Sequence, residues 1–183
     1  PCRYAVGRAG GCEVVRKTLQ VAAELWPGGA FAALDFKNAY SSVSRVAVLQ
    51  AVKRRLPALS PIAATVLADA TFHWWTGDGD EARHIEATSG VDQGCPLSPV
   101  LFACVIADPL EQLRADLQAQ NPGALVLSYL DDIYICTAPA FANAAIVRAE
   151  QLFAPLGLKL SFGDNKTQLW CPQPGTVVPT VGH

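Results

Sequence analysis

The sequence contains no methionine, only three histidines and few charged residues for its length of 183. Because methionine is absent and the first residue is Pro1, we expect the sequence to be a fragment of a longer protein. Charged residues make up 16% and apolar residues 51%, which excludes a disordered chain and a charged tail. The formal net charge of −2 excludes the overall basic character of a complete nucleic-acid-binding protein. A basic channel would have to be local or supplied by other segments.

Paired metal-binding cysteines and long apolar runs are also absent. The six cysteines are scattered without a C-x-x-C pair, and no histidine lies at zinc-ligand spacing. This pattern excludes a common zinc site and favours a reducing, intracellular compartment, either cytoplasm or nucleus. The most apolar stretch, 97–110, is interrupted by two prolines and an aspartate and is shorter than the roughly 20 residues of a membrane-spanning helix. We therefore expect no membrane partner.

The order of periodic segments predicts a single α+β domain with an antiparallel sheet backed by helices. Residues 1–171 form this domain, and 172–183, rich in proline, glycine and threonine, form a tail or linker. Ser44, Ser60 and Ser98 stand where capping residues open helices, and the helix after Ser98 is apolar on every face to Ile106, so it should be buried. The predicted helices cover 12–26, 44–55, 60–72, 98 onward and 140–156. The predicted strands cover 30–34, 73–76, 82–87, 125–130, 133–137, 158–162 and 167–171, the last two as a pair.

Acidic residues follow two of these apolar strands. Asp35 comes directly after 30–34, and Asp131 and Asp132 come directly after 125–130. Carboxylates gathered at one edge of a buried sheet repel one another, and a divalent cation removes that cost. Hard oxygen ligands suit Mg²⁺, and two such ions about 4 Å apart form the arrangement used for in-line phosphoryl transfer. The acids therefore indicate a metal-dependent phosphoryl-transfer site.

Four segments occur in a characteristic order: 35–40 (DFKNAY), 89–99 (SGVDQGCPLSP), 129–132 (YLDD) and 157–160 (GLKL) with 165–167 (NKT). Together they resemble the palm motifs of reverse transcriptases, in particular those of non-LTR retrotransposon enzymes. The resemblance runs from about Gly7 to Trp170 and depends on all four segments, because an acid pair in a turn is usually a solvated loop. It implies an α+β polymerase palm with the end of the fingers at 1–29, lacking most of the fingers and the thumb.

The resemblance also implies a set of metal ligands. Asp35 and Asp131 match the principal ligands of two Mg²⁺ ions, for which Mn²⁺ can substitute, and the carbonyl of Phe36 is a further possible oxygen ligand. Asp132 matches either a closer ligand or a supporting acid, and an ordinary hairpin-turn residue is the alternative.

Four more residues match nucleotide-handling positions of the family. Tyr40 matches the steric gate that excludes a 2′-hydroxyl, with an ordinary core aromatic as the alternative. Gln93 and Gly94 match the loop that packs on the templating base pair, with a tight turn as the alternative. Lys166 matches a lysine that neutralises or protonates the leaving pyrophosphate. Because two residues more than expected separate Gly157 from Lys166, a solvated hairpin lysine is the alternative.

The implied activity is RNA-directed DNA polymerisation, a template-directed deoxynucleotidyl transfer by a two-metal mechanism. Its partners would be an RNA template, a DNA primer, deoxynucleoside triphosphates and other domains of the parent polyprotein. We expect the fragment alone to have little or no activity. Lys37, Arg45 and the basic residues at 53–55 are interpreted as solvated helix faces and not as phosphate ligands.

Three other functions remain open. The chain could be an inactive remnant or scaffold of a retroelement, although retaining clustered acids costs a scaffold free energy. It could be the palm of an RNA-dependent RNA polymerase, against which Tyr40 and the run beginning at Gln93 argue. It could also be a different two-metal enzyme such as a nuclease, but the three histidines form no recognisable hydrolytic constellation.

Overall fold

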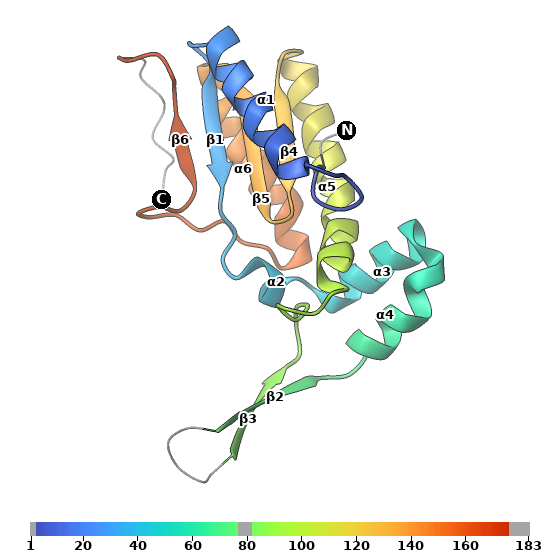
Figure 1. Ribbon diagram of the computed structural model, residues 1–183. Coiled ribbons are helices and arrows are strands. Elements are labelled where there is room, and N and C mark those ends of the chain that lie inside the picture. Colours follow the sequence, from blue (N-terminus) through green and yellow to red (C-terminus); the bar gives the residue numbers. More distant parts are fainter. Residues whose placement is uncertain (1–2, 77–81, 176–183) are drawn as a thin grey trace. The chain divides into compact units, whose positions relative to one another are not determined.

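A computed structural model describes residues 3–76 and 82–175 of the chain (Figure 1). Its contacts divide the chain into two compact units. The first is formed by Pro1–Lys37 with Ile106–His183, and the second by Asn38–Val105. Helix α5 (Ser98–Gln120) begins in the second unit and ends in the first. Each unit has its own sheet and its own set of buried apolar side chains.

The first unit is built on a four-stranded antiparallel sheet in the order β4-β5-β1-β6. One of its two inner strands, β1 (Ala30–Leu34), is buried along almost its whole length. Figure 1 shows α1 on the near side of the sheet, where it packs on β4, and α6 on the far side, where it packs on β1. The predicted α+β class with an antiparallel sheet backed by helices is confirmed. The other strands are β4 (Leu125–Tyr129), β5 (Asp132–Thr137) and β6 (Gln168–Trp170).

The helices of the first unit cover the sheet with residues spaced for one helical face. Helix α6 (Ala142–Phe153) buries Ala145, Ile146, Ala149 and Phe153, the three-to-four-residue spacing of an amphipathic helix. Short 3₁₀ turns, η2 (Pro139–Phe141) and η3 (Ala154–Leu156), extend it at both ends. Gly157 then ends it in the left-handed conformation, with φ of 82°, as its sequence position predicts. Helix α1 (Gly11–Leu25) packs on β4.

The second unit begins with the single turn α2 (Ala39–Ser42) and helix α3 (Arg45–Arg55). The Ser44 hydroxyl accepts a hydrogen bond from the amide of Ala47, which confirms the predicted cap. The turn η1 (Pro57–Leu59) and helix α4 (Ser60–Leu67) follow, and then the hairpin β2 (Thr71–Thr76) and β3 (Ala82–Ala87). The predicted glycine- and aspartate-rich turn of this hairpin falls at 77–81, outside the described residues.

The predicted end of one helix was wrong. Helix α4 stops at Leu67 and not near Phe72, because the β-branched and aromatic residues of Thr71–Thr76 pair with the next strand. Ser60 lies inside the helix, whose N-cap is Leu59, so the predicted serine cap did not form. The hairpin exposes large apolar side chains, with Trp74 exposed by 71%.

The predicted pairing of 158–162 with 167–171 was also wrong. Only Leu160 forms a bridge, and its partner is Phe36. Strand β6 pairs with β1 because the edge of β1 is available to it, while Gly163 and Asn165, with φ of 128° and 60°, turn the intervening chain. Helix α5 was predicted correctly as buried, and it continues through Pro109. Within the described ranges, no helix combines the length and apolar character needed to cross a membrane.

Candidate active site

The backbone of Asp35 is fixed by a loop from the far end of the chain. Its amide donates a hydrogen bond to the hydroxyl of Thr167 at 3.1 Å, and its carbonyl accepts one from the amide of Ser161 at 2.8 Å. The neighbouring side chain of Phe36 is buried against Phe153, with ring centroids 5.1 Å apart. These contacts hold the first acid at the end of β1, as the sequence predicted.

The β4–β5 hairpin brings the second acid pair to the same edge. Tyr129 pairs with Asp132, so Leu130 and Asp131 form the turn, and Asp132 is the first residue of β5 rather than part of the tip. Strand β1 pairs Leu34 with Ile133, the last pair of this ladder, and Asp35 and Asp132 are the next residues at the same end of it. Opposed residues of antiparallel strands have Cβ atoms about 5 Å apart, and we expect a separation of this order between the two acids.

The turn between the two strands is strained. Leu130 has a φ of 56°, a left-handed conformation that costs a residue with a Cβ atom roughly 1–2 kcal/mol. Its carbonyl accepts a hydrogen bond from the Ser128 hydroxyl at 3.1 Å, which helps to hold the turn. Strained residues concentrate at functional sites because the surrounding structure imposes a geometry that the local sequence disfavours. Leu130 therefore marks the loop that carries Asp131 as a functional candidate.

The acids interact electrostatically. The pKa of Asp132 is raised, first by burial and then by the charges of Asp131 and Asp35. One oxygen of Asp35, Oδ2, is shielded from solvent and has no hydrogen-bond partner. The ammonium nitrogen of Lys166, Nζ, lies 3.6 Å from this oxygen, an ion-pair distance too long for a hydrogen bond. The cluster therefore has negative charge that its own residues neutralise only in part.

These features fit a divalent cation in the chemistry of the donors. A shielded carboxylate oxygen without a hydrogen-bond partner, near two more carboxylates, belongs to a hard oxygen donor set of the kind that binds Mg²⁺. Within residues 3–76 and 82–175, however, no three acidic, histidine or cysteine groups are already gathered closely enough to hold an ion directly. The metal roles of Asp35, Phe36, Asp131 and Asp132 thus stay predictions.

Lys166 and Thr167 belong to the loop that supports the first acid. The amide of Thr167 donates a hydrogen bond to the Ser161 carbonyl at 3.0 Å, which closes the loop and places Lys166 beside Asp35. The side chain of Lys166 is half exposed. Sequence reasoning gave Thr167 no role, although it lies in the motif that drew attention to Lys166. Its place directly after a predicted site lysine was the signal available in the sequence, and its burial is known only from the structure.

The nucleotide-handling candidates lie in the second unit. The ring of Tyr40 stacks on Phe102, with centroids 4.7 Å apart and planes 10° from parallel. Gln93 and Gly94 are exposed, and Gly94 has a φ of 91° that favours glycine. Gln93 lines a pocket of about 490 Å³ together with Ser41, the residue after Tyr40. The structure thus groups Asp35, Phe36, Asp131, Asp132 and Lys166 in one unit, and Tyr40, Gln93 and Gly94 in the other.

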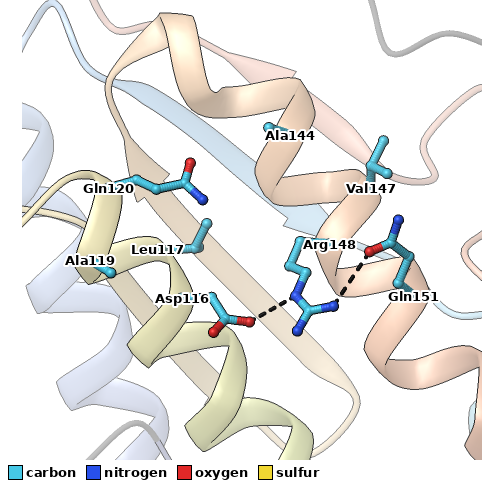
Figure 2. Close-up of a pocket in the computed structure, with 8 residues that line it drawn as sticks. All are labelled: Asp116, Leu117, Ala119, Gln120, Ala144, Val147, Arg148 and Gln151. Carbon is cyan, nitrogen blue, oxygen red and sulfur yellow. Dashed lines mark hydrogen bonds and ion pairs between the residues drawn. The ribbon is translucent and has the colours of Figure 1, made fainter.

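A second pocket, of about 540 Å³, lies between α5 and α6 (Figure 2). Arg148 Nε donates to the carboxylate of Asp116 at 2.7 Å across it, and this bond lowers the pKa of Asp116. None of the predicted site residues lines this pocket, and its ion pair joins two helices that cover the sheet. We interpret it as structural.

Comparison with known proteins decides the family. The sequence model of the family described as "Reverse transcriptase (RNA-dependent DNA polymerase)" matches residues 11–177. This chain belongs to the reverse transcriptase family. The retrotransposable element SLACS 132 kDa protein of Trypanosoma brucei gambiense is 33% identical over 129 residues, which are 69% of this chain and 11% of that protein. The predicted resemblance to retrotransposon reverse transcriptases is confirmed.

Solved structures agree on the fold of this reverse transcriptase region. Apo telomerase from Candida tropicalis matches with a TM-score of 0.67 and 12% identity over 95% of this chain and 34% of that one. Telomerase from Candida albicans, in a complex with a fragment of telomeric RNA, matches with a TM-score of 0.61 and 11% identity over 96% of this chain and 32% of that one. This reverse transcriptase region thus spans about a tenth of the retrotransposon relative and about a third of each telomerase chain.

Proposed function

We propose that this region supplies the catalytic acids of an RNA-directed DNA polymerase, which extends a DNA primer with deoxynucleotides along an RNA template. One observation carries the proposal. Asp35 lies at the same end of the β1–β5 pair as Asp131 and Asp132, and a shielded oxygen of Asp35 has no hydrogen-bond partner. Membership of the reverse transcriptase family supports assigning this acid cluster to nucleotidyl transfer.

Asp35, Asp131, Asp132 and the carbonyl of Phe36 would hold two Mg²⁺ ions, with Mn²⁺ as a substitute. When bound, the ions supply Lewis-acid activation of the primer 3′-hydroxyl and neutralise charge on the phosphates. The protein fixes the acids by its backbone, through the hydrogen bonds that hold Asp35 and through the tight turn at Leu130. Positions held in advance in this way lower the cost of assembling the transition state.

Other residues would handle the nucleotide. Lys166, within ion-pair distance of Asp35, would place a positive charge where the leaving pyrophosphate departs. Tyr40, held by its stack on Phe102, would block a 2′-hydroxyl and so select deoxynucleotides. Gln93 and Gly94 would pack on the templating base pair, Gly94 because its backbone can approach closely.

The partners follow from the same proposal. They are an RNA template, a DNA primer, deoxynucleoside triphosphates and other domains of a parent polyprotein. The retrotransposon relative and the telomerases are far longer than the region they share with this chain, and the Candida albicans telomerase was solved with an RNA fragment. We expect the chain alone to extend primers slowly or not at all, because it covers only this shared region.

The test measures binding, so that it does not depend on turnover. Electron paramagnetic resonance would follow Mn²⁺ binding to the parent chain with and without a deoxynucleoside triphosphate. Asp35→Asn and Asp131→Asn should lose this binding, and Glu150→Gln, which removes an exposed acid on α6, should keep it. Equal binding by all four proteins would refute the proposal.

Primer extension on an RNA template completes the test. Any extension by the parent chain should disappear in Asp35→Asn and persist in Glu150→Gln. Preference for ribonucleotides over deoxynucleotides would instead support an RNA polymerase, and degradation of the template without synthesis would support a nuclease.

A further inference from the structure

Arg45 is a buried positive charge at the start of a helix, which is electrostatically unfavourable. It is 7% exposed and is the only charged residue that is buried in the part of the chain the structure describes. The prediction that it lies on a solvated helix face was therefore wrong. It is also the first residue of α3, where the helix dipole disfavours a positive charge. Burying a cation at a helix N-terminus costs free energy twice, so its hydrogen bonds must offset both costs.

The guanidinium of Arg45 ties together two segments of the second unit. Its Nε donates to the carbonyl of Gly90 at 3.0 Å. Its Nη1 donates to the carbonyl of Asp69 at 2.6 Å, and its Nη2 donates to the hydroxyl of Thr71 at 2.9 Å. The planar fork of arginine suits acceptors in several directions at once, which a lysine ammonium on a flexible stem does not match.

One of these segments, residues 89–91, is fastened to the turn that carries Tyr40, and we call it the strap. The Val91 amide donates to the Tyr40 carbonyl at 2.7 Å, and the Gly90 amide donates to the Val43 carbonyl at 2.8 Å. A Cβ at Gly90 would lie 2.5 Å from the backbone of Ser41, and Gly90 has a φ of 77°. Only glycine fits this approach, so the strap and the turn form one rigid contact.

The strap leads within two residues to the loop of Gln93 and Gly94. Asp92, which lies between the strap and this loop, is itself in polar contact with β2, with its Oδ1 3.2 Å from Nε2 of His73. The start of β2 is held in turn by Arg45 through Thr71. Thus Arg45 contacts both segments that fix the approach to Gln93.

We propose that Arg45 is a positioning residue that sets the place of the Gln93 loop relative to Tyr40, and through it the discrimination between deoxynucleotides and ribonucleotides. The nucleotide roles of Tyr40 and Gln93 rest on the proposed function, whereas the coupling of the strap to the Tyr40 turn stands on the hydrogen bonds alone. The three hydrogen bonds of the Arg45 guanidinium go to Gly90, Asp69 and Thr71, and not to the side chains of Tyr40 or Gln93.

Hydrogen exchange in the chain tests the coupling without any activity. In Arg45→Met we expect the amides of Gly90 and Val91 to exchange about tenfold faster or more, because the strap loses its donor. The amide of Val52, in the interior of α3, should exchange as in the parent. Lys53→Met, which removes an exposed charge from the same helix, is the matched control and should change none of the three.

Two milder variants test the same coupling if Arg45→Met fails to fold. Thr71→Val removes one of the three acceptors, and Arg45→Lys keeps the charge but not the fork, so both should show smaller increases at Gly90 and Val91. Unchanged protection of the strap would overturn the proposal. An equal loss of protection at Val52 would also overturn it, because that pattern reports general destabilisation.

Nucleotide selectivity tests the functional consequence. The measurement is the ratio of the apparent Kd values for a ribonucleoside and a deoxynucleoside triphosphate, each with Mn²⁺. We expect this ratio to fall by about fivefold in Arg45→Met and to stay unchanged in Lys53→Met. If the parent binds neither nucleotide, the proposed function fails, and hydrogen exchange still decides the coupling. If exchange changes but the ratio does not, the role of Arg45 in sugar selection is refuted.

Discussion

Replacing Asp132 by asparagine should stabilise the chain without metal and weaken its response to metal. Asp132 lies next to Asp131 and at the same end of the strand pair as Asp35, and its pKa is raised first by partial desolvation and then by these two charges. Asparagine has nearly the same shape but no charge, so the substitution removes repulsion without opening a cavity. Two effects of opposite sign then separate the electrostatic role of this residue from its role as a ligand.

The size of the first effect follows from the strand register. Unit charges about 5 Å apart repel by roughly 1 kcal/mol in water-like surroundings and by roughly 3 kcal/mol at an effective dielectric of about 20. Although partial desolvation raises its pKa, Asp132 keeps a large exposed fraction, so solvent screens the repulsion and the lower figure applies. For a chain of this length, about 1 kcal/mol raises the Tm by roughly 2–4 °C.

The dependence on pH has a definite sign. The pKa of Asp132 in the folded chain lies above its ordinary value of 3.8, so the folded state holds this proton more tightly than the unfolded state does. Its contribution to the stability of the parent is present below pH 3.8 and is lost as the pH rises through the raised pKa. The advantage of Asp132→Asn should therefore be small in acid and should grow as the pH rises.

The second effect is measured by adding metal. At a Mg²⁺ concentration about ten times its Kd, binding stabilises the parent by about 1.4 kcal/mol. The variant should lose most of this gain if Asp132 is a ligand and keep most of it if Asp132 only supports the other acids.

Thermal melting of the parent, Asp132→Asn and Glu150→Gln, with and without Mg²⁺ and across pH, is the assay. Glu150→Gln removes an exposed acid of the same unit and should follow the parent in both respects. If Asp132→Asn without metal has the same Tm as the parent at every pH, the electrostatic reasoning is refuted.

Three other predictions follow from the structure. Gly90→Ala should destabilise the second unit by about 2–4 kcal/mol in denaturant unfolding, because its Cβ would meet the backbone of Ser41, and wild-type stability would contradict that contact. Thr167→Val should cost about 1–3 kcal/mol and speed hydrogen exchange at the amide of Asp35, which loses its acceptor; unchanged exchange there would refute it. Burial raises the pKa of Cys136 to about 12, so mass spectrometry of the native chain after brief treatment with a thiol reagent should find this residue unlabelled, and rapid labelling would contradict its burial.

Apolar periodicity and the capping and turn residues predicted most of the helices and strands, because these signals are local in the sequence. The Ser44 cap, the glycine at 157 and the alternation of apolar runs place helix and strand ends correctly without tertiary information. Predictions failed where a distant partner decided the outcome. Residues 71–76 left the predicted helix to pair with β3, and β6 joined β1 instead of the segment at 158–162.

In the candidate site, too, some features follow from the sequence alone and others only from the tertiary structure. The sequence alone determined which residues are acids at strand ends, because a carboxylate after a buried strand is visible in the order of residues, and the four ordered motifs determined the family. Only the tertiary structure decided that Asp35 and Asp132 lie at the same end of the β1–β5 pair, since strand register depends on pairing between segments about a hundred residues apart. Burial of Arg45 was equally invisible, because a basic residue at a helix start looks solvated until the carbonyls of Gly90 and Asp69 are folded onto it. Local sequence fixes what each residue can do, and long-range packing fixes which residues do it together.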